Sequence, residues 1–167
     1  MLCVTDANIW IDLANGELEE HVFQIGLELI IPNLVLVELR NPPSSRLKSI
    51  GLQPVNLSGD QLDELVGSLA RRYPGPSRVD LSALLVARDE GLTLLTGDRA
   101  LRRAAEAEGV AVHGILWILD RILDYSMLKP AEAASCLRHI VEAGARLPAA
   151  EVTKRLHLWD PDDSSIE

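Results

Sequence analysis

Aromatic side chains are scarce in this chain of 167 residues, because tryptophan, tyrosine and phenylalanine together make up only 4% of it. Since 47% of the residues are nonetheless hydrophobic, a core has to be built mainly from leucine, isoleucine, valine and alanine. A chain of this length fits one ordinary domain with enough volume for such a core.

Several common catalytic and metal-binding patterns are missing. Cys3 and Cys136 form no C-x-x-C pair, so we expect two reduced thiols rather than a disulfide or a metal site. The four histidines lack the spacing of zinc ligands, which makes zinc an unexpected cofactor. Neither G-x-S-x-G nor G-x-x-x-x-G-K-[ST] occurs, and this removes the usual serine hydrolase and P-loop interpretations.

Long hydrophobic runs are absent as well. The longest apolar stretches are well short of the ~20 residues that a membrane span needs. The N-terminus has no basic region followed by a long apolar run, so no secretory signal is visible. We therefore expect a cytoplasmic protein that does not enter a membrane.

The chain also lacks an excess of positive charge, since its net charge is −9. The last eight residues, 160–167, hold four acids and no base, and we expect them to be a disordered tail. Residues 71–103 instead carry seven arginines against four acids, which is compatible with a phosphate-binding face. A solvated charged surface explains these arginines equally well.

Short apolar runs alternate with amphipathic stretches over the first 114 residues. The runs typical of strands are 2–5, 27–31, 92–95 and 110–114, with a proline-limited edge strand at 52–57. The stretches typical of helices are 7–13, 17–25, 33–40, 58–73, 78–90 and 99–108. This alternation predicts an α/β fold of three layers, in which helices cover both faces of a central, mainly parallel sheet.

The last third of the chain shows only helical patterns. An apolar stripe at helical spacing runs from Ile115 to Met127, and Pro130 and Pro148 each stand where a further helix would begin. Such stripes must be covered by the chain itself, by a second copy or by a partner. The predicted parts are therefore an α/β domain at 1–114, a helical extension at 115–159 and the acidic tail at 160–167.

Four carboxylates are placed where a parallel sheet would gather them. Asp6 directly follows the first strand, and Asp98 follows the strand at 92–95. Ligands of open parallel sheets bind beyond the carboxyl ends of the strands. Glu38 and Asp80 share helix faces with apolar residues, an inward position that a charged group rarely takes without a partner. If the four converge, their repulsion raises their pKa values until a cation such as Mg²⁺ or Mn²⁺ enters.

Each of these acids also has an ordinary structural explanation. Asp6 and Asp98 have the side chain and the place of helix caps. Glu38 can reach the surface at the end of its helix, and Asp80 suits a first turn because of the helix dipole. Taken singly, caps are more common than ligands, so the functional interpretation depends on convergence.

The order of four motifs resembles the PIN domain, the fold of metal-dependent ribonucleases that includes VapC-type toxins. The motifs are VTDANIWIDL, PNLVLVELR, VDLSALLVARDEG and LLTGDRALRRAAEAEGVAVHG, and together they cover about residues 2–114. The helices after residue 114 depart from compact toxins of this type. The residues similar to the family's acids are Asp6, Glu38, Asp80 and Asp98, and those similar to its small polar and hydroxyl positions are Asn8 and Thr96.

The resemblance implies hydrolysis of phosphodiester bonds in single-stranded RNA. One or two Mg²⁺ or Mn²⁺ ions held by the four acids would activate water and stabilise the leaving oxygen. Asn8 and Thr96 would orient the ligands, and Arg99 is the nearest cation in sequence for the developing charge. Trp10 is either a core residue or a platform for a base.

The resemblance further implies that the chain is the toxin of a toxin–antitoxin pair and forms a homodimer. We expect the helix from Ile115 to Met127 to pack on its own domain, and the two later helices to be the contact surface. A purely intramolecular cap is the alternative for those two helices.

Two other functions remain open. A binding or regulatory protein could keep a PIN-like fold and use its carboxylates little, which the acidic balance and the helical extension permit. A phosphoaspartyl phosphatase with Asp6 as the nucleophile is a weaker interpretation, because that chemistry prefers a second acid where this chain has Asn8.

Overall fold

The computed structural model describes residues 1–161 and contains one sheet of five strands in the order β3-β2-β1-β4-β5. The strands are β1 (Leu2–Thr5), β2 (Glu28–Pro32), β3 (Gln53–Val55), β4 (Thr93–Leu95) and β5 (Val112–His113). Every neighbouring pair is parallel. The predicted α/β fold with a parallel central sheet is confirmed. Most of the predicted acidic tail, residues 162–167, lies outside the described residues.

Helices connect the strands and follow the last one. They are α1 (Ala7–Asn15), α2 (Asn33–Glu38), α3 (Ser44–Ser49), α4 (Gly59–Glu64), α5 (Ala70–Arg72), α6 (Arg78–Asp89), α7 (Arg99–Ala107), α8 (Ile115–Asp124), α9 (Pro130–Glu142) and α10 (Ala149–Trp159). A 3₁₀ helix at His21–Phe23 and a π-helical stretch at Leu65–Leu69 complete the set. Within residues 1–161, no helix is both long and apolar enough to cross a membrane.

The helix predicted over 17–25 is wrong for most of its length. Only His21–Phe23 is helical there, and it is a 3₁₀ turn. Glu17 has a φ of 57° and Gly26 a φ of 71°, and left-handed residues at both ends limit a helix between them. The short helix α3 lies in a stretch for which no element was predicted.

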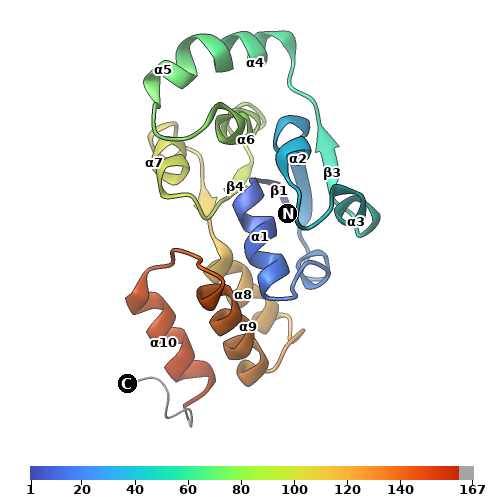
Figure 1. The fold of residues 1–167 in the computed structure, drawn as a ribbon, viewed down its shortest axis with the longest axis vertical. Helices are drawn as coiled ribbons and strands as arrows, with labels where there is room; N and C mark the ends of the chain where they lie inside the picture. Colours follow the sequence, from blue (N-terminus) through green and yellow to red (C-terminus); the bar gives the residue numbers. More distant parts are fainter. Residues whose placement is uncertain (162–167) are drawn as a thin grey trace.

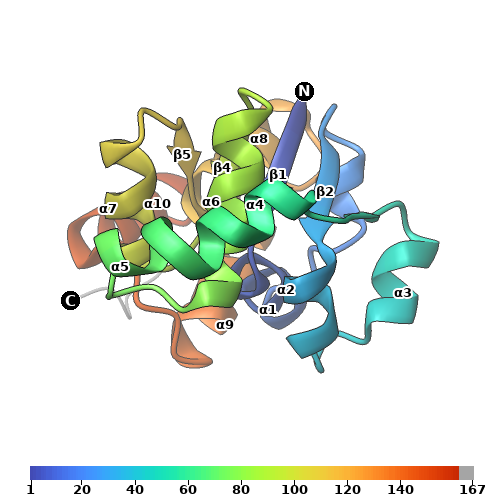
Figure 2. The same ribbon diagram turned by 90° about the horizontal axis from the view of Figure 1, so that it is seen from above.

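The strands divide their side chains between two apolar clusters, one on each face of the sheet. On β1, Cys3 packs with α1, α8 and α9, whereas Val4 packs with α6 and α7. Leu95 and Leu94 on β4 divide in the same way, as successive residues of a strand must. Figure 1 shows α4, α5 and α6 above the strands and α8, α9 and α10 below them, and Figure 2 gives the view from above. The molecule is thus layered as helix, sheet, helix.

The first two C-terminal helices contribute to the cluster below the sheet. Ile118 and Ile122 of α8 and Leu137 and Ile140 of α9 are fully buried in it. A Cβ atom built on Gly16, the residue that ends α1, would lie only 2.9 Å from Cδ1 of Ile140. The inner face of α9 is therefore covered by its own chain, which agrees with the alternative of an intramolecular cap. The homodimer stays a prediction.

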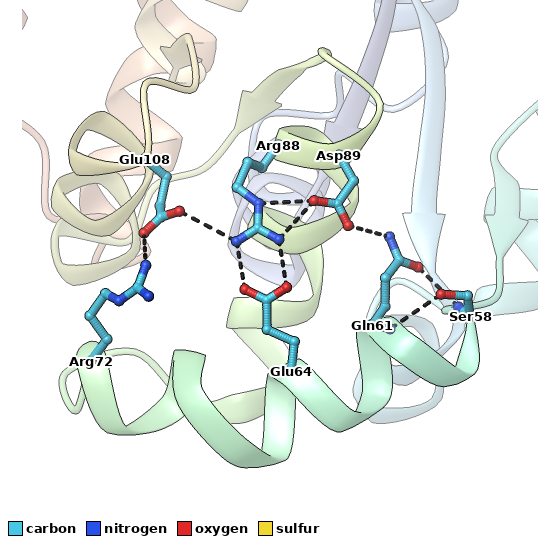
Figure 3. Close-up of polar contacts among 7 residues, drawn as sticks. All are labelled: Ser58, Gln61, Glu64, Arg72, Arg88, Asp89 and Glu108. Atoms are coloured by element: carbon cyan, nitrogen blue, oxygen red, sulfur yellow. Dashed lines mark hydrogen bonds and ion pairs between the residues drawn. The ribbon is translucent and has the colours of Figure 1, made fainter.

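A network of charged side chains joins α4 and α5 to α6 and α7 (Figure 3). The guanidinium of Arg88 on α6 donates two parallel hydrogen bonds of 2.7 Å to Glu64 of α4. It also contacts Asp89 and Glu108, and Glu108 accepts a 2.8 Å bond from Arg72. The hydrogen bonds from Arg88 hold the pKa of Glu64 below its usual range. Arg88 thus stands at the centre of the network.

Replacement of Arg88 by alanine is expected to lower the free energy of unfolding by about 1–2 kcal/mol at pH 7, because Glu64 and Glu108 lose a charged donor between helices. Urea denaturation measures this loss. The difference should shrink as the pH falls below about 4, since the benefit of a lowered carboxyl pKa is lost once the carboxyl is protonated. Arg71→Ala is the matched control, because Arg71 is exposed and has no partner among the described residues. An equal loss in both variants would contradict the network's role.

Candidate functional site

Asp6 and Thr96 lie at the carboxyl ends of the two central strands. β1 pairs with β2 on one side and β4 on the other, so the chain winds outward in both directions from the β1–β4 boundary. Ligands of open parallel sheets bind at such a switch point. The backbone N–H of Asp6 donates to the carbonyl of Leu95 at 3.2 Å, which continues the ladder up to the acid. The predicted placement of Asp6 beyond the strand end is thus seen in the fold.

The hydroxyl of Thr96 connects the first acid to the last. It donates to Oδ2 of Asp6 and accepts a 2.9 Å bond from the backbone N–H of Asp98. Thr96 is itself fully buried. One hydroxyl therefore sets the position of the Asp6 carboxylate and of the backbone that carries Asp98.

Both aspartates are also helix caps, as their ordinary explanation required. Oδ1 of Asp6 accepts a 3.0 Å bond from the N–H of Ile9 at the start of α1. Oδ1 of Asp98 accepts a 2.6 Å bond from the N–H of Leu101 at the start of α7. Oδ2 of Asp98 has no hydrogen-bond partner among residues 1–161. Capping and a second role are therefore compatible for Asp98, because its cap uses one carboxylate oxygen and leaves the other.

Asp80 lies in the first turn of α6, near enough to Asp6 for its charge to raise the pKa of that carboxyl. Ser77 and Asp80 form a reciprocal cap, in which the Ser77 hydroxyl donates to Oδ2 of Asp80 at 2.7 Å and accepts from its N–H at 3.0 Å. Oδ1 of Asp80 makes no hydrogen bond to a described residue. Ser77 was not singled out from the sequence, although the spacing S-x-x-D is a known capping pattern.

The charges of Asp80 and Asp98 both affect the pKa of the Asp6 carboxyl. Burial raises the pKa of Asp6, the hydrogen bonds from Thr96 and Ile9 oppose this rise, and the charges of Asp80 and Asp98 add to it, which leaves the pKa at about 7. Asp6 is 0% exposed and forms no ion pair with any described residue. A buried carboxylate that is repelled by two others and lacks a cation is unfavourable in its charged form.

Glu38 does not take the inward position that its sequence neighbours suggested. It ends α2 and is exposed, and Leu34, which shares its face, is 40% exposed. The inward side of this short helix is occupied by Val35 and Leu36 instead. The prediction of an inward Glu38 is wrong. It makes no hydrogen bond or ion pair within the described part of the chain.

The other predicted residues are distributed around the acids. Asn8 is half-buried on the first turn of α1, and Arg99 is exposed as the first residue of α7. Trp10 is a core residue and not a platform for a base, because it is 0% exposed and its Nε1 donates to the hydroxyl of Thr5 at 2.9 Å. Its packing on Phe23 completes that burial.

The carboxylate oxygens of the three aspartates suit a hard divalent cation, although the side chains are not close enough together to surround one. Asp6, Asp80 and Asp98 offer only oxygen atoms, which Mg²⁺ and Mn²⁺ prefer, and a cation would relieve the repulsion on Asp6. Among residues 1–161, however, no three His, Cys, Asp or Glu side chains lie close enough together to form a metal site.

A cavity of about 510 Å³ opens beside Asp98. Its walls come from α1, from the turn between β4 and α7, and from the loop between α9 and α10. Asp12, which sequence reasoning missed, lines it and is only 8% exposed. The sequence pattern that could have identified Asp12 is the polar stripe of Asn8, Asp12 and Asn15, which are spaced by four and three residues along an otherwise apolar helix.

Residues 2–161 match the family DUF3368, which is described as a PIN domain. The chain belongs to this PIN-domain family. The match includes α8, α9 and α10 as well as the α/β part. No curated protein matches the sequence significantly.

Two solved structures are similar to this PIN domain in fold. A PilT N-terminus domain protein from the hyperthermophilic archaeon Sulfolobus solfataricus P2 has 14% identity and a TM-score of 0.50, with 75% of this chain and 93% of that chain covered. VapBC2 from Rickettsia felis, bound to a DNA fragment from its promoter, has 17% identity and a TM-score of 0.49, with 68% and 98% covered. At these identities the likeness concerns the fold alone.

Proposed function

We propose that this PIN domain is an endoribonuclease that hydrolyses phosphodiester bonds of single-stranded RNA with Mg²⁺ or Mn²⁺. The observation that carries the proposal is the buried carboxylate of Asp6, which has no cation partner among residues 1–161 and is repelled by Asp80 and Asp98 at the switch point of the sheet. Membership of a family whose members are generally nucleases supports it.

Asp6, Asp80 and Asp98 would hold the ion, with Glu38 reaching it from the exposed end of α2. The ion would lower the pKa of an attacking water and stabilise the leaving oxygen. Oδ1 of Asp80 and Oδ2 of Asp98 have no hydrogen-bond partner among residues 1–161, so two of the three aspartates have a ligand oxygen to offer.

The protein's own side chains have separate tasks in this proposal. Thr96 keeps Oδ2 of Asp6 in place through its hydroxyl, and Ser77 does the same for Oδ2 of Asp80. Asn8 orients the substrate or the water from the first turn of α1. Arg99 is exposed beside Asp98 and attracts the phosphate, whose negative charge rises in the transition state.

Purified protein is expected to cleave single-stranded RNA with Mn²⁺ or Mg²⁺ and to lose that activity when EDTA removes the ion, because the carboxylates alone cannot activate water. Cleavage of a labelled oligoribonucleotide on a gel measures both. Restoration by added Mn²⁺ is the control for damage by EDTA. Cleavage that continues undiminished in EDTA, or no cleavage under any condition, would count against the proposal.

A binding or regulatory protein is the second candidate, and one observation favours it: no three ligand side chains lie at metal-binding distance within residues 1–161. Calorimetry with Mn²⁺ separates the two candidates. A nuclease should bind the ion and an interaction module has no reason to do so at this site.

The toxin role, an antitoxin partner and the homodimer stay predictions of the family resemblance. The described face that would receive an antitoxin segment is the one around Asp98 and its neighbouring cavity. Co-expression with a candidate antitoxin and sizing of the purified chain test these predictions directly.

A further inference from the structure

The cavity beside Asp98 is shaped by three segments that are far apart in the sequence. Asn8, Ile11, Asp12 and Asn15 of α1 form one wall, Gly97 to Arg99 a second, and residues 143–147 between α9 and α10 the third. Its volume of about 510 Å³ lies within the range of small-molecule sites in proteins. Because Asp98 belongs to it, the cavity adjoins the proposed centre of hydrolysis.

A nearly buried carboxylate without a partner lines this cavity. Asp12 is 8% exposed, and its side chain makes no hydrogen bond or ion pair with residues 1–161. Its Oδ2 lies 3.3 Å from the point where a Cβ on Gly97 would stand, and glycine leaves that approach open. Burial raises the pKa of Asp12 to about 6, so at pH 8 both oxygens are acceptors. Neither oxygen of Asp12 is among the fully enclosed, unpaired polar atoms of the described residues, so a ligand in the cavity can reach them.

Cations and apolar side chains make up much of the rest of the lining. Arg99 and Arg146 are both exposed and have no hydrogen-bond or ion-pair partner in the described chain. Ile11 and Leu147 add apolar surface. The cavity therefore combines the carboxylate acceptors of Asp12 and Asp98, apolar walls and two guanidinium groups that remain in contact with solvent.

We propose that this cavity receives the RNA nucleotide next to the cleaved phosphodiester, that Asp12 accepts hydrogen bonds from its base, and that Arg146 binds its phosphate. The proposal rests on the proposed function and names a subsite for it. It gives the C-terminal helices a part in substrate binding, because Arg146 lies in the loop between α9 and α10.

Guanine is the base that fits best. Its Watson–Crick edge presents two adjacent N–H donors, at N1 and N2, which match the two oxygens of one carboxylate. Adenine and cytosine offer a single amino group beside a ring-nitrogen acceptor, and uracil offers one N–H between two carbonyl acceptors. Single-stranded RNA is read on this edge, and a good bidentate contact discriminates strongly between bases.

The two arginines favour a nucleotide over a basic peptide in this cavity. A peptide arginine could also pair with Asp12, but the charges of Arg99 and Arg146 in the same lining repel it. The same charges attract a phosphate. No aromatic side chain of the described residues lines the cavity, so aromatic stacking does not contribute there and discrimination has to come from the base edge.

Binding of the four nucleoside 5′-monophosphates in EDTA at pH 8, followed by calorimetry or NMR titration, tests the proposal without catalysis. The guanine nucleotide should bind at least about tenfold more tightly than the others. Asp12→Asn keeps the shape of the side chain but offers only one acceptor, so the preference should fall below about twofold. Arg146→Ala should weaken all four about equally, since phosphate contacts carry no base information. Arg103→Ala is the matched control, because Arg103 is exposed and does not line the cavity.

Equal binding of the four nucleotides, no binding at all, or an unchanged preference in Asp12→Asn would overturn the proposal. Tighter binding of an acetylated arginine amide than of any nucleotide would overturn it too, because the cavity would then be a peptide site. RNA cleavage without this nucleotide binding leaves the proposed function standing and removes the subsite. Selective binding without RNA cleavage leaves the cavity standing as a guanine-nucleotide site and removes the nuclease function, and with it the place of that site in hydrolysis.

Discussion

Asp6→Asn is expected to lower the rate of RNA cleavage by about 10²–10⁴-fold, as is usual when a group that holds a catalytic ion is lost. Asparagine keeps the shape and can still accept the hydrogen bond from the N–H of Ile9, so α1 should retain its cap. What it removes is the negative charge at the switch point of the sheet, together with the acceptor of the Thr96 hydroxyl. Initial rates on a labelled oligoribonucleotide at saturating Mn²⁺ measure the change.

Asp63→Asn is the matched control for this experiment. Asp63 is exposed on α4 and has no hydrogen-bond or ion-pair partner in the described part of the chain, so the same change of charge there should leave the rate within about twofold. Equal rates for wild type and Asp6→Asn would refute the catalytic role of Asp6.

The metal-free protein is expected to lose about 2–3 kcal/mol of stability between pH 5 and pH 8 because of Asp6 alone. Its pKa is raised to about 7 in the fold, so the folded state binds the proton more tightly than the unfolded state does. Stability is then highest at low pH and falls as the pH rises from the ordinary aspartate pKa to about 7. Asp6→Asn removes this slope and should be more stable than wild type at pH 8.

Urea denaturation in EDTA at several pH values gives the difference between wild type and Asp6→Asn. Asp12 also has a raised pKa, but it is present in both proteins and cancels from that difference. Glu64 and Glu108 have lowered pKa values, and their effect belongs to more acidic solutions. A difference that does not grow with pH would show that the Asp6 carboxyl is not held at a raised pKa.

Asp6→Asn is expected to lower the rate of RNA cleavage and to raise the stability at pH 8, and together these two opposite changes form one test. A variant that is less active and less stable could simply be damaged. A variant that is far less active and yet more stable has lost a charge that the fold does not need, and a buried charge of that kind is typical of functional sites. Added Mn²⁺ should stabilise wild type at pH 8 and leave Asp6→Asn nearly unchanged.

The layers of the fold could be predicted from local patterns. Apolar runs such as Leu92–Leu95 must lie between two helical layers, and the acids that follow them must then come to one edge of the sheet. This reasoning placed Asp6 and Asp98 correctly after β1 and β4. Thr96, whose hydroxyl joins them, was singled out only through the family resemblance.

Long-range packing could not be predicted in this way. Glu38 shares the spacing of an inward residue, but α2 has only six residues and turns that side to solvent. Asp12 has the spacing of an ordinary surface acid on a short helix. It is buried because the turn at Gly97 and the loop at 143–147 lie against α1 from distant parts of the chain. Such a site depends on where segments dock, and that information is not local.

The contact between Gly16 and Ile140 offers a way to shift the wall of the cavity that residues 143–147 form. Any side chain at position 16 pushes on α9, and the loop that carries Arg146 begins where that helix ends. A designer who pairs a larger residue at 16 with a smaller one at 140 could shift this wall without touching a residue that meets the substrate. Relatives with differently packed residues at these two positions could in the same way differ in the RNA they accept.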